Sequence, residues 1–313
     1  MGYIRQQRDV AMKIYGNRSW REGRRRWLFV LRSIKNRKQV EAFTNYFQNY
    51  APLPDFLEKH IEVEEVINRI FFYANSSAAE RLQGIQDHFD ALSQLFSTAG
   101  IQQMYRDIGY MDVAEEDKTA GITIWESSEL GMQANLVYIP GQRKEGLLSL
   151  LLTIDGEGLY HINFRFEKEL ETSEIVVHVG TIQGYPNGLD KAKQATKKMY
   201  GYRPKNFIFF ILRQLATVLG ITRMKAVSDE GFYTNTHMIR GNRHKLIRFN
   251  PFWEELGGHV SHDVRFYDIP VTEMRKSLEE IKSQKRNQYR NRYAFLDGVT
   301  EEIGRRLAPY VRV

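Results

Sequence analysis

The chain has 313 residues, of which 42% are hydrophobic and 12% aromatic, a composition typical of a folded globular protein. It contains no cysteine, so disulfides, thiolate metal sites and cysteine nucleophiles are excluded. No apolar run approaches the roughly 20 residues that cross a bilayer, and no signal-peptide core is visible, so we expect a cytoplasmic protein without a transmembrane segment.

The formal charge is +7, and the positive charge gathers in two stretches. Nine basic residues fall between Arg18 and Lys38, and five more fall between Lys282 and Arg292. Such clusters attract nucleic acid, anionic lipid or acidic proteins through long-range steering and counterion release. The alternative is that both stretches are ordinary solvated helix faces.

Residues 1–118 are predicted to form a helical N-terminal region. Apolar residues recur at helical spacing among the basic ones, from Trp27 to Val40, and again over residues 56–108. Prolines at 52 and 54 separate the two parts. His88 lies on an apolar stripe of the second part, where a histidine is more often a core residue than a catalyst.

At Gly121 the hydrophobic pattern changes from helical spacing to alternation, which predicts strands. In the clearest of these, residues 159–166, apolar side chains occupy one face and place His161, Asn163 and Arg165 on the other. The expected strands form an antiparallel meander at residues 122–125, 136–139, 147–154, 159–166 and 175–179.

The segment Phe207–Leu219 has almost no polar face, so we expect a buried helix, begun near Pro204 and ended by Gly220. A strand at 222–227, a short amphipathic piece at 252–258 and a closing strand at 264–269 follow. Together these elements predict an α+β fold with a mixed, mostly antiparallel sheet around one buried helix.

Three regions are expected from this order of elements. Residues 1–118 form the N-terminal helical region, and residues 119–271 form the core with the sheet. Residues 272–313 form a basic C-terminal helix packed on that core, with Met274, Leu278 and Ile281 among its inward-facing residues.

Short strings in the second half of the chain resemble the VirK/YbjX (DUF535) family of bacterial proteins. The most specific is the Tyr-Gly-x-Arg-Pro-Lys string at residues 200–205, and others lie at 182–184, 226–228, 252–258 and 289–297. The resemblance implies a link to virulence and to resistance against host peptides in enteric bacteria. It implies no particular reaction.

The order strand, glycine turn, helix, strand, helix, strand over residues 174–270 is similar to the GNAT acyltransferase fold, including its toxin-activating branch. In that fold a Gln/Arg-x-x-Gly-x-Gly/Ala turn precedes a helix, and its backbone N–H groups hold the pyrophosphate of acyl-CoA. Gln183, Gly184 and Gly188 occupy the matching turn in this sequence. The alternative is that both glycines only shape the turn.

This turn departs from the GNAT pattern, because Pro186 removes one N–H donor and a basic segment separates the turn from the apolar helix. Arg203, Lys205 and the N–H groups at Asn206 are therefore a second candidate anion site, at the start of that helix. The alternative is that Arg203 and Lys205 only neutralise the C-terminus of the preceding helix.

A long polar stretch, Asp229 to Asn250, joins the predicted strand at 222–227 to the amphipathic piece. Such loops are often functional. Histidine suits a general base because it titrates near neutral pH, so we predict His237 as the catalytic base and His244 as a second candidate. Asp229 is placed to orient one of them. No metal is expected, since the histidines and aspartates at 259–268 form no recognised ligand set.

These features favour an acyltransferase, which moves an acyl or aminoacyl group onto an amine or hydroxyl of a small-molecule or peptide acceptor. Its donor is expected to be acyl-CoA, acyl carrier protein or aminoacyl-tRNA. The alternative is a non-enzymatic protein whose basic surfaces hold nucleic acid, anionic lipid or an acidic protein. The sequence leaves the donor, the acceptor and the oligomeric state open.

Overall fold

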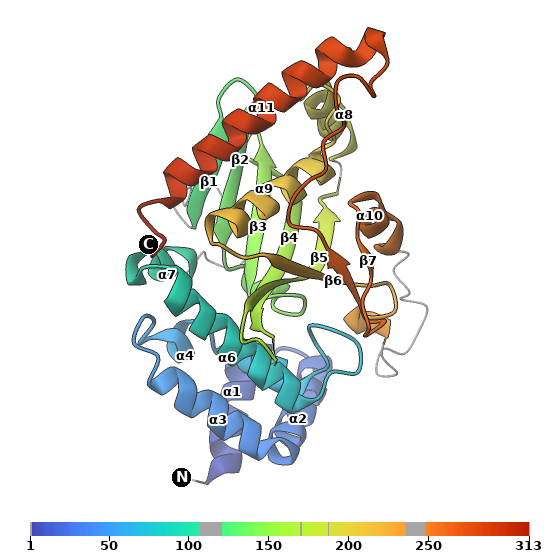
Figure 1. The fold of residues 1–313 in the computed structure, drawn as a ribbon. Helices are drawn as coiled ribbons and strands as arrows, with labels where there is room; N and C mark the ends of the chain where they lie inside the picture. Colours follow the sequence, from blue (N-terminus) through green and yellow to red (C-terminus); the bar gives the residue numbers. More distant parts are fainter. Residues whose placement is uncertain (1, 107–120, 170, 187, 236–247, 313) are drawn as a thin grey trace.

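The computed structural model describes residues 2–106, 121–169, 171–186, 188–235 and 248–312. It is an α+β protein with one mixed sheet, as predicted from the sequence (Figure 1). Helices of the N-terminal region gather at one end of the molecule, and the long C-terminal helix crosses the sheet toward the other end (Figure 1).

The first part of the chain is helical, as its apolar spacing predicted. Two helices begin with complete capping boxes, in which Ser19 pairs with Glu22 and Ser77 pairs with Glu80. The predicted proline break lies between α3 and α4. The elements are α1 (Tyr3–Tyr15), α2 (Trp20–Lys35), α3 (Arg37–Gln48), α4 (Phe56–Lys59), the 3-10 helix η1 (Ile61–Val63), α5 (Glu64–Asn68), α6 (Ala78–Leu95) and α7 (Thr98–Met104).

The sheet has the strand order β1-β2-β3-β4-β5-β6-β8-β7. Neighbouring strands are antiparallel except β5 and β6, which are parallel and are joined through helices α8 and α9. The strands are β1 (Ile122–Ser127), β2 (Met132–Val137), β3 (Leu148–Ile154), β4 (Glu157–Lys168), β5 (Ile175–Gly184), β6 (Arg223–Val227), β7 (His259–Val260) and β8 (Phe266–Ile269). The remaining helices are α8 (Leu189–Lys198), α9 (Pro204–Val218), α10 (Asn250–Glu255) and α11 (Ser283–Leu307), and short 3-10 turns lie at η2 (Pro140–Gln142) and η3 (Tyr233–Asn235).

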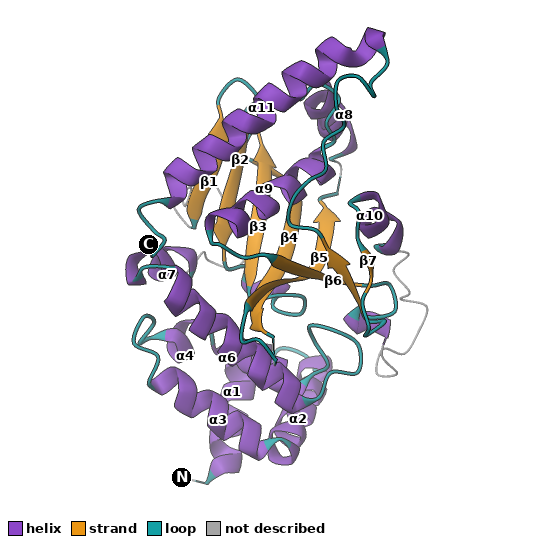
Figure 2. Ribbon diagram, in the orientation of Figure 1, coloured by secondary structure: helices purple, strands orange, loops and turns teal. Residues whose placement is uncertain are grey.

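Helix α9 is the buried helix that the sequence predicted. Residues 207–212 are each at most 3% exposed, and Phe207 packs edge-on against Trp125 of β1 with ring centres 4.9 Å apart. Arg213 is buried too, and its guanidinium donates to the carbonyl oxygens of Leu256 (2.8 Å) and Pro270 (2.9 Å). Helices α9 and α11 cover one face of the sheet (Figure 2).

Three sequence predictions were wrong in detail. β5 does not stop at Val179, because its ladder with β4 continues to Gly184 opposite Tyr160. The C-terminal helix begins only at Ser283, since residues 272–282 run as a non-helical segment held by contacts such as the Tyr202 hydroxyl to Glu273 (2.6 Å). Met274, expected to face inward, is 93% exposed.

The C-terminal end of the described chain meets the junction between α6 and α7. Phe96, just after α6, forms a backbone bridge with Val311, and the N–H of Ser97 donates to the carbonyl oxygen of Tyr310 (2.7 Å). Helices α7 and α11 also both contact β1. The boundaries at residues 118 and 271 stay a prediction, because helices from both sides pack on the same sheet.

Helix α2 packs by a different face from the one that its apolar residues suggested. Phe29 and Ser33 are buried, and Ser33 accepts a hydrogen bond from the side chain of Asn68 in α5 (2.8 Å). Trp27 and Leu31, on the other side, are exposed. None of the helices in the described part of the chain has the length and apolarity that spanning a bilayer requires.

Candidate active site

The parallel strands β5 and β6 pair over only a short stretch. Their register runs from Val176 opposite Arg223 to Val179 opposite Ala226, and β6 ends one residue later. β5 continues to Gly184, paired with β4 alone in the part of the chain that the structure describes. The residues of β5 beyond Val179 therefore form a strand edge beside the point where β6 leaves the sheet.

Gly180 sits at a bulge in this part of β5, because Val179 pairs with Phe164 while Thr181 pairs with Asn163. A Cβ atom at Gly180 would lie 1.7 Å from the carbonyl oxygen of Glu145. Only glycine permits this contact, so Gly180 lets the backbone of Glu145 lie directly on β5. The bulge thus places Glu145 against the sheet.

The sheet face opposite α9 carries a row of buried polar residues. Ser149, Asn163 and Thr181 are cross-strand neighbours on β3, β4 and β5, and each is at most 2% exposed. The Ser149 hydroxyl donates to Asn163 Oδ1 (2.7 Å), and Asn163 Nδ2 donates to Glu145 Oε2 (3.0 Å) and Gln142 Oε1 (3.3 Å). Buried polar groups need such partners, so this network fixes the position of the Glu145 carboxylate.

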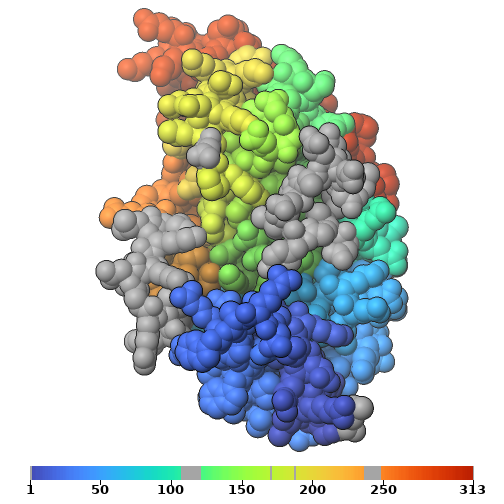
Figure 3. All heavy atoms as spheres, turned by 180° about the vertical axis from the view of Figure 1, so that it is seen from behind, coloured from blue at the N-terminus to red at the C-terminus, as the bar shows by residue number. Residues whose placement is uncertain are grey.

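A second polar pair lies next along the same strands. His161 of β4 is opposite Gln183 of β5, and the Gln183 side chain donates to Thr181 Oγ1 (3.0 Å). His161 is 5% exposed, and its ring meets that of Tyr185 edge-on at 5.2 Å. We refer to Glu145, Ser149, His161, Asn163 and Thr181 as the polar row. Viewed from behind, the sheet lies above the N-terminal helices (Figure 3).

The predicted donor turn lies at the end of β5. Gly184 is the last residue of the strand, and Gly188 is the N-cap of α8, a helix of 10 residues. The N–H of Gly188 already donates to the carbonyl oxygen of Tyr185 (3.3 Å). The turn therefore leads into the basic helix α8, and the apolar helix α9 begins only at Pro204.

The second predicted anion site already contains a carboxylate. Glu255 of α10 forms an ion pair with Arg203 and accepts a hydrogen bond from Asn206 Nδ2 (2.9 Å). Although partial burial opposes it, these hydrogen bonds lower the pKa of the Glu255 carboxyl. The Lys205 ammonium lies 3.8 Å from the centre of the Phe252 ring, and burial lowers its pKa. A phosphate would have to displace Glu255 here.

Asp229 joins the two ends of the predicted catalytic loop. Its carboxylate accepts the N–H of Phe249 (2.5 Å), and its own N–H donates to Asn250 Oδ1 (2.8 Å). His237 and His244 lie outside the described residues. Among the described residues, no three imidazole or carboxylate groups gather as a metal ligand set.

Arg165, the third polar residue that alternation placed on this face of β4, belongs to a structural cluster. It is fully buried, with Nε 2.7 Å from Glu167 Oε1 and its guanidinium 4.5 Å from the Phe72 ring centre. Burial, and then the neighbouring Arg165 charge, holds the pKa of His178 well below its usual range, so His178 is neutral at physiological pH. The cluster ties the N-terminal helices to the sheet.

Sequence reasoning placed His161 and Asn163 on the correct face but did not recognise them as part of a site. The sequence did contain a signal for this, because histidine and asparagine are unusual on the face of a strand whose neighbours are buried, and buried polar side chains need partners. The partner carboxylate, Glu145, comes from a loop, and no local pattern indicated its position.

Fold and site together define an α+β protein with one mixed sheet. Its two parallel strands, β5 and β6, part beyond Val179, and the polar row lies beside these parted strands. The chain belongs to the DUF535 family, since the family model described as a protein of unknown function (DUF535) matches residues 18–305.

The similar proteins come from bacteria. The uncharacterized protein YbjX of Escherichia coli is 26% identical over 310 residues, covering 93% of this chain and 84% of that protein. An uncharacterized protein of Haemophilus influenzae is 21% identical over 284 residues, covering 90% and 88%. A mutant of the cAMP-binding acyltransferase from Mycobacterium smegmatis superposes with a TM-score of 0.25 at 13% identity, covering 51% of this chain and 40% of that chain.

Proposed function

We propose that this protein is an acyltransferase that moves an acyl group from a pantetheine-bearing donor, acyl-CoA or acyl carrier protein, onto an amine or hydroxyl. The observation that carries the proposal is the edge of β5 beyond Val179, where β6 has ended. An extended chain with amide groups can pair with such an edge as an added strand would. Pantetheine is a chain of this kind, whereas the acceptor end of tRNA is not, so the edge favours the first two donors over aminoacyl-tRNA.

The charge around the end of β5 also supports an anionic donor. Helix α8 carries Lys191, Lys193, Lys197 and Lys198, of which the first two are paired with Glu157 (2.7 Å) and Asp190 (3.3 Å). In the described residues, no carboxylate lies within ion-pairing distance of Lys197 or Lys198. These lysines suit the diphosphate of CoA or the acidic surface of a carrier protein.

The chemical step needs one base and an oriented acceptor. The acceptor nitrogen or oxygen attacks the thioester carbonyl, the carbon–sulfur bond breaks, and the base passes the acceptor proton to the departing thiolate. We assign the base to His237, on the segment whose ends Asp229 joins just after β6. The polar row lies beside the parted strands, and its Glu145 carboxylate suits a positively charged or hydroxyl-bearing acceptor.

The absence of cysteine makes a direct assay possible, because a thiol reagent has no background from the protein itself. Acyl-CoA and acyl carrier protein are each incubated with a panel of amines and hydroxyls, and the released thiol is measured. We expect wild-type protein to release thiol. His237→Ala should slow the reaction by about a hundredfold while donor affinity stays unchanged, since loss of a base leaves binding intact.

The matched control is His259→Ala, because His259 is an exposed histidine on β7, away from the parted strands. It should keep wild-type turnover. If no donor binds by calorimetry and no thiol is released, the protein is not an acyltransferase. If turnover is unaffected in His237→Ala but lost in Glu145→Gln, the transferase assignment stands and the base lies in the polar row.

A further inference from the structure

Helix α2 has two apolar faces, and only one of them serves the core. Phe29 and Ser33 face inward, whereas Trp20, Trp27 and Leu31 recur at helical spacing on the opposite side. Trp20 is 78% exposed and Trp27 is 62% exposed. Exposed tryptophans on one stripe contribute nothing to folding, so they indicate a surface that meets an apolar partner.

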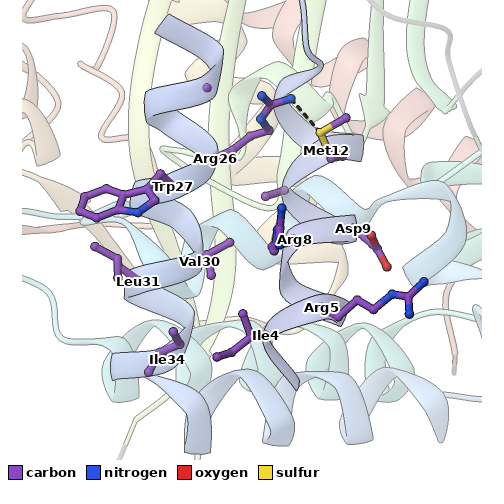
Figure 4. A pocket seen from close by; sticks show the side chains of 12 residues that line it. Ile4, Arg5, Arg8, Asp9, Met12, Arg26, Trp27, Val30, Leu31 and Ile34 are labelled. Atoms are coloured by element: carbon purple, nitrogen blue, oxygen red, sulfur yellow. Dashed lines mark hydrogen bonds between the residues drawn. The ribbon is translucent and has the colours of Figure 1, made fainter. Parts of the chain in front are cut away.

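The stripe continues across the groove between α1 and α2, which has a volume of 990 Å³ and is shown in Figure 4. Ile4 of α1 and Ile34 of α2 line it and are both about half exposed. Arg26 Nη1 donates to the carbonyl oxygen of Gly16 at the end of α1 (2.7 Å), which holds the two helices as one unit. The surface is therefore preformed, and Trp27 projects from it on the side away from α1 (Figure 4).

Positive charge surrounds this stripe. Residues 1–38 contain twelve arginines and lysines against two carboxylates, a formal charge of +10, so the rest of the chain carries −3. Arg21, Arg24 and Lys35 flank the stripe on α2 at helical spacing. Among the described residues, no carboxylate is within ion-pairing distance of these three side chains.

We propose that α1 and α2 form a docking surface for an anionic lipid bilayer. Tryptophan and branched aliphatic side chains on one face, flanked by arginines, are the composition of helices that lie in the plane of a membrane interface. The indoles enter the headgroup region, and the arginines pair with lipid phosphates. This inference is independent of the acyltransferase assignment.

A bilayer fits the observations better than other anionic partners. A projecting Trp27 enters a deformable lipid phase without a matching cavity, whereas a folded acidic protein would have to supply one. Nucleic acid is bound by stacked aromatic rings and cations, and the aliphatic residues Ile4, Leu31 and Ile34 would gain nothing from it.

The test is co-sedimentation of the full chain with vesicles of phosphatidylcholine alone or with phosphatidylglycerol as about one third of the lipid. We expect binding only to the anionic vesicles, weakening as salt is raised. Brominated lipids provide a second measurement. The chain has four tryptophans, and because Trp125 and Trp253 are buried, quenching reports on Trp20 and Trp27.

Two pairs of variants separate the apolar and charged contributions. The apolar variant carries Trp27→Ser and Leu31→Ser, and the charge variant carries Arg21→Gln and Arg24→Gln. Each should weaken binding to anionic vesicles by about tenfold or more. The apolar control is Leu189→Ser with Met274→Ser, since both residues are exposed elsewhere. The charge control is Lys285→Gln with Arg290→Gln on the exposed face of α11.

Circular dichroism checks that each variant is folded, which is expected because all eight side chains are exposed. Selective loss in the α1–α2 variants, with loss of quenching, supports the proposal. Equal loss in the controls, or unchanged binding in the α1–α2 variants, would overturn it. So would a result in which vesicles do not bind while RNA or an acidic peptide binds through the same arginines.

Discussion

Replacing Glu64 by glutamine is expected to stabilise the protein above neutral pH and to leave its stability unchanged in mild acid. Glu64 begins α5 and is 2% exposed, and its Oε1 atom has no hydrogen-bond partner in the described structure. Burial raises the pKa of its carboxyl group to about 7, with a hydrogen bond from Gln7 of α1 opposing part of the rise. The folded protein therefore keeps this carboxyl protonated over a range in which the unfolded chain ionises it.

The magnitude follows from the change in pKa. The ordinary value is 4.5, so between about pH 4.5 and 7 the folded state binds more protons than the unfolded state, and the free energy of unfolding falls as pH rises. Each pH unit is worth about 1.4 kcal/mol, so the full loss above pH 7 is about 3 kcal/mol. A glutamine is neutral throughout and avoids this loss.

The assay is urea unfolding followed by far-ultraviolet circular dichroism at about pH 4, below the ordinary carboxyl pKa, and at about pH 8.5. Glu64→Gln should match the wild type at the lower pH and exceed it by up to about 3 kcal/mol at the higher pH. Glu58→Gln, on an exposed residue of α4, is the matched control and should show no pH-dependent difference. An equal difference between Glu64→Gln and wild type at both pH values would refute a protonated, buried carboxyl.

Three further substitutions test the core and the site. Ile211→Asp should prevent folding, because an unpaired charge at this fully buried position of α9 costs several kcal/mol; a normal melting transition would contradict the packing of α9. Gly180→Ala should lower stability by about 1–3 kcal/mol, since its Cβ must push Glu145 off β5, and a melting temperature equal to wild type would show that the contact is loose. Glu167→Gln should cost about 2 kcal/mol in denaturant unfolding, because the buried Arg165 loses its charged partner, and no change would mean that Arg165 is paired otherwise.

Local sequence patterns were sufficient to predict most of the fold. Alternation over residues 159–166 correctly described β4, and the unbroken apolar run from Phe207 correctly described a helix buried on the sheet. A strand that is buried on one face has alternating apolar residues, and a helix that is buried on all faces has a continuous apolar run. Both patterns can therefore be read from local spacing. The order of strands followed because consecutive antiparallel strands pair with their neighbours.

Features that depend on distant partners were not visible in the sequence. Arg203 looks like a free cation in its own segment, yet its partner Glu255 lies 52 residues further along the chain. The apolar residues of α2 suggested a buried stripe, but packing on α5 through Ser33 and Asn68 left them outside. Likewise, Glu145 lies in a loop and Gly180 lies in β5, and no local spacing of apolar residues predicts that the two are in contact.

The bridge between Phe96 and Val311 has a consequence for how the protein is made. Residues 308–312 leave the ribosome after every other element described here, yet they supply the backbone partners of Leu95, Phe96 and Ser97. During synthesis, backbone groups at the end of α6 and the start of α7 therefore stay exposed until residues 308–312 have been made. This junction therefore closes only after residues 308–312 have been made, and a nascent chain stalled before Tyr310 should remain open to proteases at the α6–α7 junction.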